Sequence, residues 1–264
     1  MAHAEDGSSL PRLVEIMRTL LGPGGCPWDR EQTLSSLRSY VIEEAHEVVE
    51  AIDGGEPGAL QEELGDLLLQ VVFQSELARA QGWFGPDDVV AGICDKLQRR
   101  HPHVFGDVEV RDADEVSANW DAIKALEKAE RGTFDGVPVA LPALLRAMRI
   151  GQRASRIGFD WPDAVGPRAK VDEELAEFDA ACASGSDEEA ERELGDVLFA
   201  LCSVARKRGL DPEGALRGTL GRFVDRVAVV ERASDEAGES VAELAKRDPA
   251  ALDALWSQAK RGQR

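Results

Sequence analysis

Apolar residues recur along most of this chain with the spacing of amphipathic helices. Between Val41 and Ile52 they stand at positions 41, 42, 45, 48, 49 and 52, which fall on one stripe at 100° per residue. The stretch DGGEPG, 53–58, then interrupts the pattern, and a second stripe begins at Leu60. The pattern predicts two antiparallel helices joined by a tight turn and packed along facing apolar stripes.

The same pattern occurs twice. EELGDLLLQ, 62–70, returns as RELGDVLFA, 192–200, at an offset of 130 positions. Further matches keep the same order in both halves: LPRLVEIM (10–17) with LPALLRAM (141–148), VIEEAHEVVEAI (41–52) with VDEELAEFDAAC (171–182), DKLQRR (95–100) with GRFVDR (221–226), and NWDAIK (119–124) with LWSQAK (255–260). So long a period indicates a duplicated domain and not a solenoid.

The duplication predicts an all-α protein made of two helical-bundle domains. We expect an N-terminal domain at 1–130, a linker at 131–140 and a C-terminal domain at 141–264, because AERGTFDGVPVA (129–140) holds two glycines and a proline between helical patterns. ASDEAGES (233–240) also interrupts the pattern and is expected to be a loop or a frayed helix end.

The amino-acid composition favours helices, and the net charge limits the kinds of molecule that the protein is expected to bind. Hydrophobic residues make up 43% of the chain but aromatic residues only 5%, and abundant Ala, Leu, Glu and Arg favour helices over strands. The formal net charge of −19 predicts that neither nucleic acid nor an anionic membrane is a partner. The four cysteines suggest no disulfide framework, and no signal pattern or apolar run of about 20 residues occurs, so we expect a cytoplasmic protein.

Acidic residues border the apolar stripes of the first helix pair. Glu44 and Glu47 lie about 60° apart on the first helix, and Glu63 and Asp66 take the same angular position on the second. A hairpin centred on Gly55 would pair Glu44 with Asp66, and Glu47 with Glu63. The pattern therefore predicts four carboxylates at matching heights on facing helices.

The second copy repeats this arrangement around Gly185. Its pairs are Glu174 with Asp196 and Glu177 with Glu193. Carboxylates so close repel one another, so either they splay apart into solvent or a divalent cation lies between them. Oxygen ligands without His or Cys suit Mg²⁺, or Mn²⁺. The residues alone leave both possibilities open.

Other catalytic motifs are absent from the sequence or incomplete. There is no phosphate-binding glycine loop, no dinucleotide-binding glycine motif and no Gly-x-Ser-x-Gly turn. Glu43 and His46 form one Glu-x-x-His, but the second copy has Ala176 in place of the histidine, which argues against a di-iron site. His101 and His103 flank a proline, which favours a helix exit over a metal site.

Several short motifs follow one another in order along the chain: GCPWD (25–29), EEAHE (43–47), EELGD (62–66), KLQRRHPHVF (96–105), NWDAIK (119–124) and GFDW (158–161). In this ordered combination, which covers nearly the whole chain, the sequence resembles the MazG family of nucleoside triphosphate pyrophosphohydrolases. The resemblance implies duplicated domains of the all-α NTP pyrophosphatase type and a homodimer. It also implies Mg²⁺-dependent cleavage of NTPs or dNTPs to the monophosphate and pyrophosphate. The implied cellular role is to remove surplus or non-standard nucleotides from the nucleotide pool.

The resemblance also implies roles for individual residues of the C-terminal half. Glu174, Glu177, Glu193 and Asp196 would hold the metal, and Glu173 would activate or position the attacking water. The implied substrate contacts are Lys170, Arg222 and Arg226 for the triphosphate and Trp256 for the base. Some members have a lysine where this chain has Glu189, so one phosphate contact is missing here or is replaced by Arg192.

The N-terminal copy keeps matching residues. They are Glu43, the acids Glu44, Glu47, Glu63 and Asp66, and the substrate-contact candidates Lys96, Arg100 and Trp120. By resemblance to tandem bacterial members we expect the C-terminal domain to be the main catalyst, with the first copy a second catalyst or a scaffold. Two alternatives stay open: a non-catalytic helical scaffold or regulator, and a base-selective dUTP or dCTP pyrophosphatase.

Overall fold

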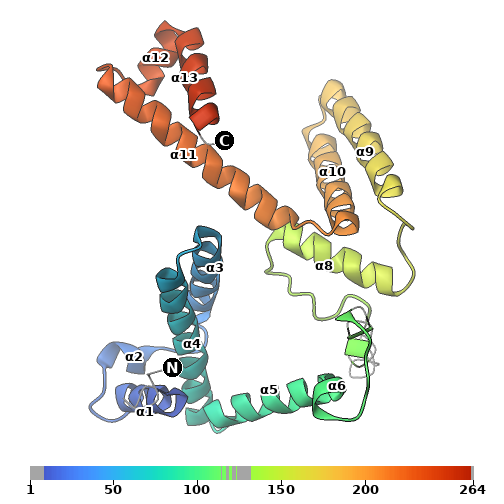
Figure 1. The fold of residues 1–264 in the computed structure, drawn as a ribbon. Helices are drawn as coiled ribbons and strands as arrows, with labels where there is room; N and C mark the ends of the chain where they lie inside the picture. The colour runs from blue at the N-terminus through green and yellow to red at the C-terminus, as the bar shows by residue number, and fades with distance from the viewer. Residues whose placement is uncertain (1–8, 114, 117–118, 121–122, 124–131, 263–264) are drawn as a thin grey trace. The chain divides into compact units, whose positions relative to one another are not determined.

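The structure is a computed structural model that describes residues 9–113, 115–116, 119–120, 123 and 132–262. Every regular element among these residues is a helix, which confirms the expected all-α class (Figure 1). The chain divides into two compact units, Met1–Ala129 and Glu130–Arg264, and each is described by itself. The sequence predicts that the first domain ends at residue 130 and that the linker begins at 131. Both positions lie outside the described residues, as do the first eight residues.

The first unit is built on one helical hairpin. Its described helices are α1 (Leu10–Leu21), α2 (Pro27–Glu31), α3 (Arg38–Gly54), α4 (Pro57–Ala80), α5 (Pro86–Arg100) and α6 (Pro102–Phe105). Helix α3 packs along α4, and α1 packs on the far part of α4. Met17 from α1 and Phe73 from α4 are buried in the core that joins these two helices.

The second unit repeats this plan. Its described helices are α8 (Ala143–Arg156), α9 (Val165–Ser184), α10 (Asp187–Arg208), α11 (Pro212–Glu236), α12 (Val241–Arg247) and α13 (Pro249–Gly262). Helices α9 and α10 form the hairpin, and α8 packs on α10 as α1 packs on α4. Helix α11 packs mainly against α13 and, to a smaller extent, against α12 and α8.

Both hairpins turn at the glycines on which the sequence pattern is centred. Gly55 ends α3 with φ +73°, and Gly185 ends α9 with φ +77°. A residue with a Cβ rarely adopts this left-handed conformation, which is why glycine so often ends a helix. Pro57 then starts α4, and the Ser186 side chain accepts a hydrogen bond from the Glu189 amide to cap α10.

The structure contains two interruptions between helices that the sequence predicts, although the exact residues at which the helices end differ. Helix α5 ends at Arg100 and α6 begins at Pro102, so His101 lies at the predicted helix exit and His103 lies in the short helix α6. The stretch 233–240 is helical as far as Glu236, because the left-handed residue that stops α11 is Gly238, with φ +78°. None of the described helices has the length and apolar character needed to cross a membrane.

Candidate metal centre and nucleotide site

The α3–α4 hairpin gathers acidic side chains of the first unit. Carboxylate oxygens of Glu44, Glu63 and Asp66 all lie within 4.8 Å of one another. Burial, and then the charges of Asp66 and Glu47, raise the pKa of Glu44. Burial and the neighbouring Glu47 likewise raise the pKa of Glu63. The turn thus brings like charges together, as the sequence pattern predicts, although Glu47 stands outside the closest group of three.

The α9–α10 hairpin gathers a second acidic group. Carboxylate oxygens of Glu174, Glu177 and Glu193 all lie within 4.8 Å of one another. Asp196, the fourth acid expected here, follows one turn along α10 but does not belong to this closest group. Each half therefore brings three of its four acids together, and the acid left out differs between the halves.

Basic side chains accompany the second acidic group. The Lys170 ammonium lies 2.6 Å from a Glu174 oxygen and 2.8 Å from a Glu173 oxygen, and the Arg192 guanidinium lies 2.8 Å from Glu193. The hydrogen bond from Lys170 lowers the pKa of Glu174. The hydrogen bond between Glu177 and Glu174 raises the pKa of Glu177. These cations offset part of the repulsion that the first group keeps.

The donor chemistry of both groups suits a hard divalent cation. Each offers three carboxylate oxygens and no sulfur or imidazole ligand at the centre. Mg²⁺ and Mn²⁺ prefer such oxygen donors, and Mg²⁺ commonly binds a few carboxylates together with substrate phosphates. A cation would also offset the charge repulsion that, after burial, raises the pKa of Glu44 and Glu63 and, after the hydrogen bond with Glu174 and burial, that of Glu177. The residues therefore fit Mg²⁺ or Mn²⁺.

The remaining sequence-predicted contacts of the second unit lie on another helix pair. Arg222 and Arg226 are on α11 and Trp256 is on α13, where the Trp256 ring meets the Phe223 ring edge-on at 5.4 Å. Among the described residues, α11 has its main contacts with α13, α12 and α8 and not with α9 or α10. The structure thus places Lys170 and Arg192 at the acids but does not bring these three residues to them.

The matching residues of the first unit form a small aromatic and basic cluster. The Arg100 guanidinium lies 5.5 Å from the centre of the Trp120 ring, and His101 meets that ring edge-on at 4.7 Å. Lys96 lies one turn earlier on α5. Glu43 and Glu173, the proposed water-positioning residues, are both exposed, each directly before an acid of its group.

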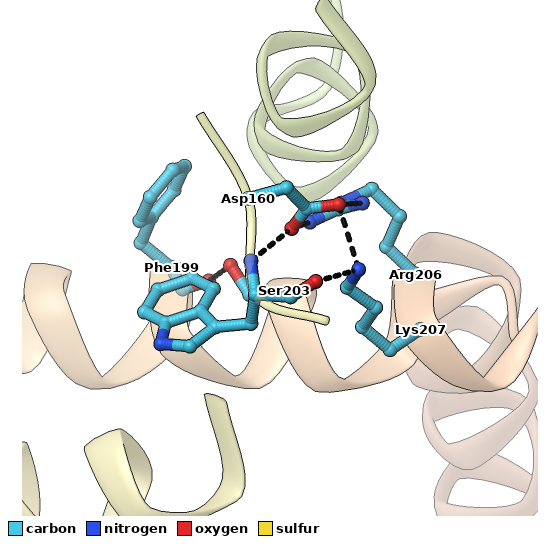
Figure 2. A network of polar contacts seen from close by, with 6 residues as sticks. Asp160, Phe199, Ser203, Arg206 and Lys207 are labelled. Carbon is cyan, nitrogen blue, oxygen red and sulfur yellow. Dashed lines mark hydrogen bonds and ion pairs between the residues drawn. The ribbon is translucent and has the colours of Figure 1, made fainter. Parts of the chain in front are cut away.

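A polar network that the sequence patterns do not predict lies near the C-terminal end of α10. The Asp160 carboxylate, which follows α8, accepts hydrogen bonds of 2.9 and 2.5 Å from Arg206 and lies 2.7 Å from the Lys207 ammonium (Figure 2). Arg206 holds the pKa of Asp160 well below its usual range. The available signal was an acid between two aromatic residues in GFDW, 158–161, together with an Arg-Lys pair near the end of an apolar helix.

Comparison with known families and proteins gives consistent matches. The model of the MazG nucleotide pyrophosphohydrolase domain matches residues 32–105, and that of phosphoribosyl-ATP pyrophosphohydrolase matches 162–218. The chain is 41% identical to the nucleoside triphosphate pyrophosphohydrolase/pyrophosphatase MazG of Thermotoga maritima, over 98% of both chains. It is also 41% identical to the nucleoside triphosphate pyrophosphohydrolase of Escherichia coli K12, over 96% of this chain and 98% of that one. Each matched segment contains one of the two acidic groups.

Proposed function

The chain belongs to the MazG family and is a nucleoside triphosphate pyrophosphohydrolase, and from this premise we propose that it converts NTPs and dNTPs to monophosphate and pyrophosphate with Mg²⁺ or Mn²⁺ as its cofactor. The observation that carries the proposal is the convergence of three carboxylates within 4.8 Å in each half. Because the chain belongs to a family of enzymes, a purely non-catalytic scaffold is excluded as the function of the whole chain.

In the proposed site the second acidic group, with Asp196, holds the metal. The bound metal would neutralise charge on the triphosphate and orient it for attack. Lys170 and Arg192 lie beside these acids and are placed to contact phosphate oxygens as well. Glu173 is exposed and hydrogen-bonded to Lys170, a position from which its carboxylate could accept a proton from the attacking water.

We assign the main catalytic role to the C-terminal unit. At the repeat offset of 130, the position of Lys170 is held by Tyr40 in the first half, and the position of Arg192 by Glu62. Glu62 adds a negative charge that helps to raise the pKa of Glu63. A triphosphate is strongly anionic, so it is favoured beside Lys170 and Arg192 and disfavoured beside Glu62. The first unit then serves as a scaffold that keeps a cation-binding group.

We further propose that the protein works as a homodimer. Leu64, Leu68 and Val71 form an exposed apolar stripe on α4, and each is between 43% and 49% exposed. Leu194, Leu198 and Leu201 form the equivalent stripe on α10 and are 44–46% exposed. Contiguous apolar surface of this kind usually marks an interface. A second copy of the chain is the partner that the family resemblance implies.

The proposed cellular role is clearance of the nucleotide pool. The net charge of −19 supports free nucleotides over nucleic acid as the ligand. The cytoplasmic location expected from the sequence stays a prediction. A base-selective dUTP or dCTP pyrophosphatase has the same chemistry, and a panel of nucleotides separates it from the broad activity proposed here.

The test measures pyrophosphate release from each NTP and dNTP with Mg²⁺ present. The proteins are wild type, Glu44→Gln/Asp66→Asn and Glu174→Gln/Asp196→Asn. We expect the C-terminal double variant to lose release and the N-terminal double variant to keep it. Loss only in the N-terminal variant would reverse the assignment of the units. No release by wild type from any nucleotide, with either Mg²⁺ or Mn²⁺, would refute the proposed activity.

A further inference from the structure

A cavity of about 340 Å³ lies in the first unit where α4 is followed by α5. Its lining comes from Arg18 near the end of α1, from Arg79 near the end of α4, and from residues 82–88. Figure 1 shows α1 beside the end of α4 at which α5 begins. Arg79 follows Asp66 by 13 positions, which is about 20 Å along a helix. The cavity is therefore separate from the first acidic group, and its volume is within the range of small-molecule sites.

One buried carboxylate holds two guanidinium groups at this cavity. The Glu76 side chain is 1% exposed, and its oxygens accept hydrogen bonds from Nε of Arg18 at 3.0 Å and from Nε of Arg79 at 2.6 Å. The two arginine side chains remain 46% and 51% exposed. Among the described residues, only the Nε of Arg18 has an acceptor, so its two terminal nitrogens are free to donate. Two cations against one anion leave positive charge and N–H donors for an anionic ligand.

The segment between α4 and α5 forms another wall of the cavity. Gly82, with φ +74°, ends the turn after α4, and the backbone amide of Trp83 donates a hydrogen bond of 3.1 Å to the Ala78 carbonyl. A Cβ on Gly85 would lie 3.2 Å from Cδ of Arg79, so the arginine stem packs directly against this glycine. Contacts on both sides thus fix the two aromatic residues that lie between the glycines.

These aromatic residues are exposed. Trp83 is 62% exposed and Phe84 is 46% exposed, and both line the cavity. The second unit makes the same turn with Gly209 at φ +67° and with the Leu210 amide bonded to the Ala205 carbonyl. The turn itself therefore requires a glycine and not a tryptophan. Because so much of the Trp83 side chain lies outside the core, its surface is available to a molecule that binds in the cavity.

Two acids limit the charge of such a molecule. Asp87 and Asp88, in the first turn of α5, also line the cavity, and Asp88 accepts a hydrogen bond of 2.8 Å from the Gly85 amide. They offset the partial positive charge at the start of α5 and repel a ligand that carries several negative charges. A single anionic group at the arginines keeps its ion pairs with less of this repulsion. The lining therefore suits one phosphate and an aromatic ring better than a triphosphate.

We propose that this cavity binds a nucleoside monophosphate, with the phosphate at Arg18 and Arg79 and the base stacked on Trp83. Guanidinium groups recognise phosphate oxygens through adjacent N–H donors, and nucleobases stack on aromatic side chains. The positive charge comes from side chains, so binding needs no divalent cation, unlike binding at the acidic groups. That the same molecule is the product of catalysis rests on the proposed function.

The test measures binding in excess EDTA, which removes binding that depends on a metal. Calorimetric titration of the full chain gives the Kd of adenosine monophosphate, and inorganic phosphate and adenosine are titrated separately. We expect wild type to bind the monophosphate more tightly than either part. Arg18→Gln and Trp83→Leu, which installs the residue at Leu210, should each weaken this binding by about tenfold. The matched controls Arg12→Gln and Trp28→Leu alter exposed residues of α1 and α2 and should leave the Kd unchanged.

Four results would overturn the proposal. The first is the absence of saturable monophosphate binding by wild type in EDTA. The second is an unchanged Kd in Trp83→Leu, which decides the matter even if Arg18→Gln fails to fold because Glu76 loses a partner. The third is equal affinity for inorganic phosphate and the monophosphate. The fourth is dissociation of the assembly by Trp83→Leu, seen in sedimentation, which would make the aromatic residues a subunit contact.

The failure of this proposal is distinguishable from that of the proposed function. Pyrophosphate release is measured with Mg²⁺, whereas binding at this cavity is measured without it. Retained release together with no binding in EDTA would refute only the assignment of the cavity. Binding in EDTA without any release in Mg²⁺ or Mn²⁺ would refute only the proposed activity.

Discussion

At the residue scale, two basic side chains make the acidic groups of the two halves different. Lys170 and Arg192 each form an ion pair shorter than 3 Å with an acid of the second group. The first half has Tyr40 and Glu62 at the matching positions. The two cations are themselves partly exposed, at 36% and 65% of their side-chain surface, so they remain accessible to an anionic ligand while they pair with these acids.

Exchanging one of these charges should therefore affect turnover. We expect Arg192→Glu to lower kcat/KM for ATP by about 100-fold, because a negative charge replaces a donor beside the developing charge of the transition state. Pyrophosphate release at saturating Mg²⁺ is the measurement. Glu62→Arg makes the opposite change at the matching position and should leave the rate within about twofold of wild type. A fall of equal size in both variants would show that the units share catalysis.

The raised pKa values of the acids predict how cation binding depends on pH. A carboxyl whose folded pKa lies above its usual 4.5, such as Glu44, Glu63 or Glu177, binds more protons when folded than when unfolded. Without metal, its contribution to stability therefore falls as pH rises through the folded pKa. A divalent cation competes with these protons and restores that stability at higher pH.

We expect Mg²⁺ to raise the Tm more at pH 7.5 than at pH 5. Thermal unfolding followed in excess EDTA and in excess Mg²⁺, at both pH values, measures this difference. The double variant Glu174→Gln/Glu193→Gln should lose the part of the Mg²⁺ effect that belongs to the second unit. A Tm that does not respond to Mg²⁺ at either pH would contradict the binding of metal by these acids in the absence of nucleotide.

At the element scale, the turn of each hairpin determines which acids meet. Antiparallel helices that turn at Gly55 and Gly185 place Glu44 near Asp66 and Glu177 near Glu193. A shift of the turn by one residue would rotate one helix by 100° relative to the other. The left-handed glycines thus control the register of the acidic groups as well as the ends of the helices.

Adjacent glycines provide a matched test of this role. Gly55 has φ +73°, whereas Gly54 is the last helical residue of α3, and a Cβ has open space at both. We expect Gly55→Ala to lower the free energy of unfolding by about 1–2 kcal/mol, and Gly54→Ala to raise it by about 0.5 kcal/mol. Urea denaturation of each variant measures the change. Equal effects of the two substitutions would show that the left-handed turn is not required.

At the scale of the whole molecule, the two halves expose the same surfaces. The stripe on α4 and the stripe on α10 match at the offset of 130, and Leu216, Leu220 and Phe223 are further exposed apolar residues on α11. A duplicated protein can cover such stripes either within one chain or between two chains. The proposed homodimer selects the second arrangement.

Sedimentation equilibrium distinguishes these arrangements. We expect a mass near twice 28.6 kDa at micromolar concentration. Leu198→Glu places a charge in the α10 stripe and should shift the protein to the monomer, because an unpaired charge is costly in an apolar interface. Leu210→Glu, at an exposed leucine between α10 and α11, is the control and should leave the mass unchanged. A monomeric wild type would mean that the stripes are covered within one chain.

The sequence by itself determined the helices, the duplication and the approach of three acids to one another across each hairpin. These features depend on local periodicity and on a turn only a few residues long, so residues near one another in sequence suffice to predict them. Glu44 and Asp66 illustrate this, since the position of Gly55 alone places them opposite each other.

Only the tertiary structure decided which contacts form between segments that are distant in sequence. Ser203 and Gly151 are unremarkable in sequence, and they open a cavity only because α8 packs on α10 where α1 fills the matching space with Leu20 and α4 with Phe73. Asp160 likewise gains its partners because the end of α10 brings Arg206 and Lys207 to it from 46 and 47 positions away. Such contacts join segments that are distant in sequence, and their consequences depend on side-chain volume and geometry that no periodicity records.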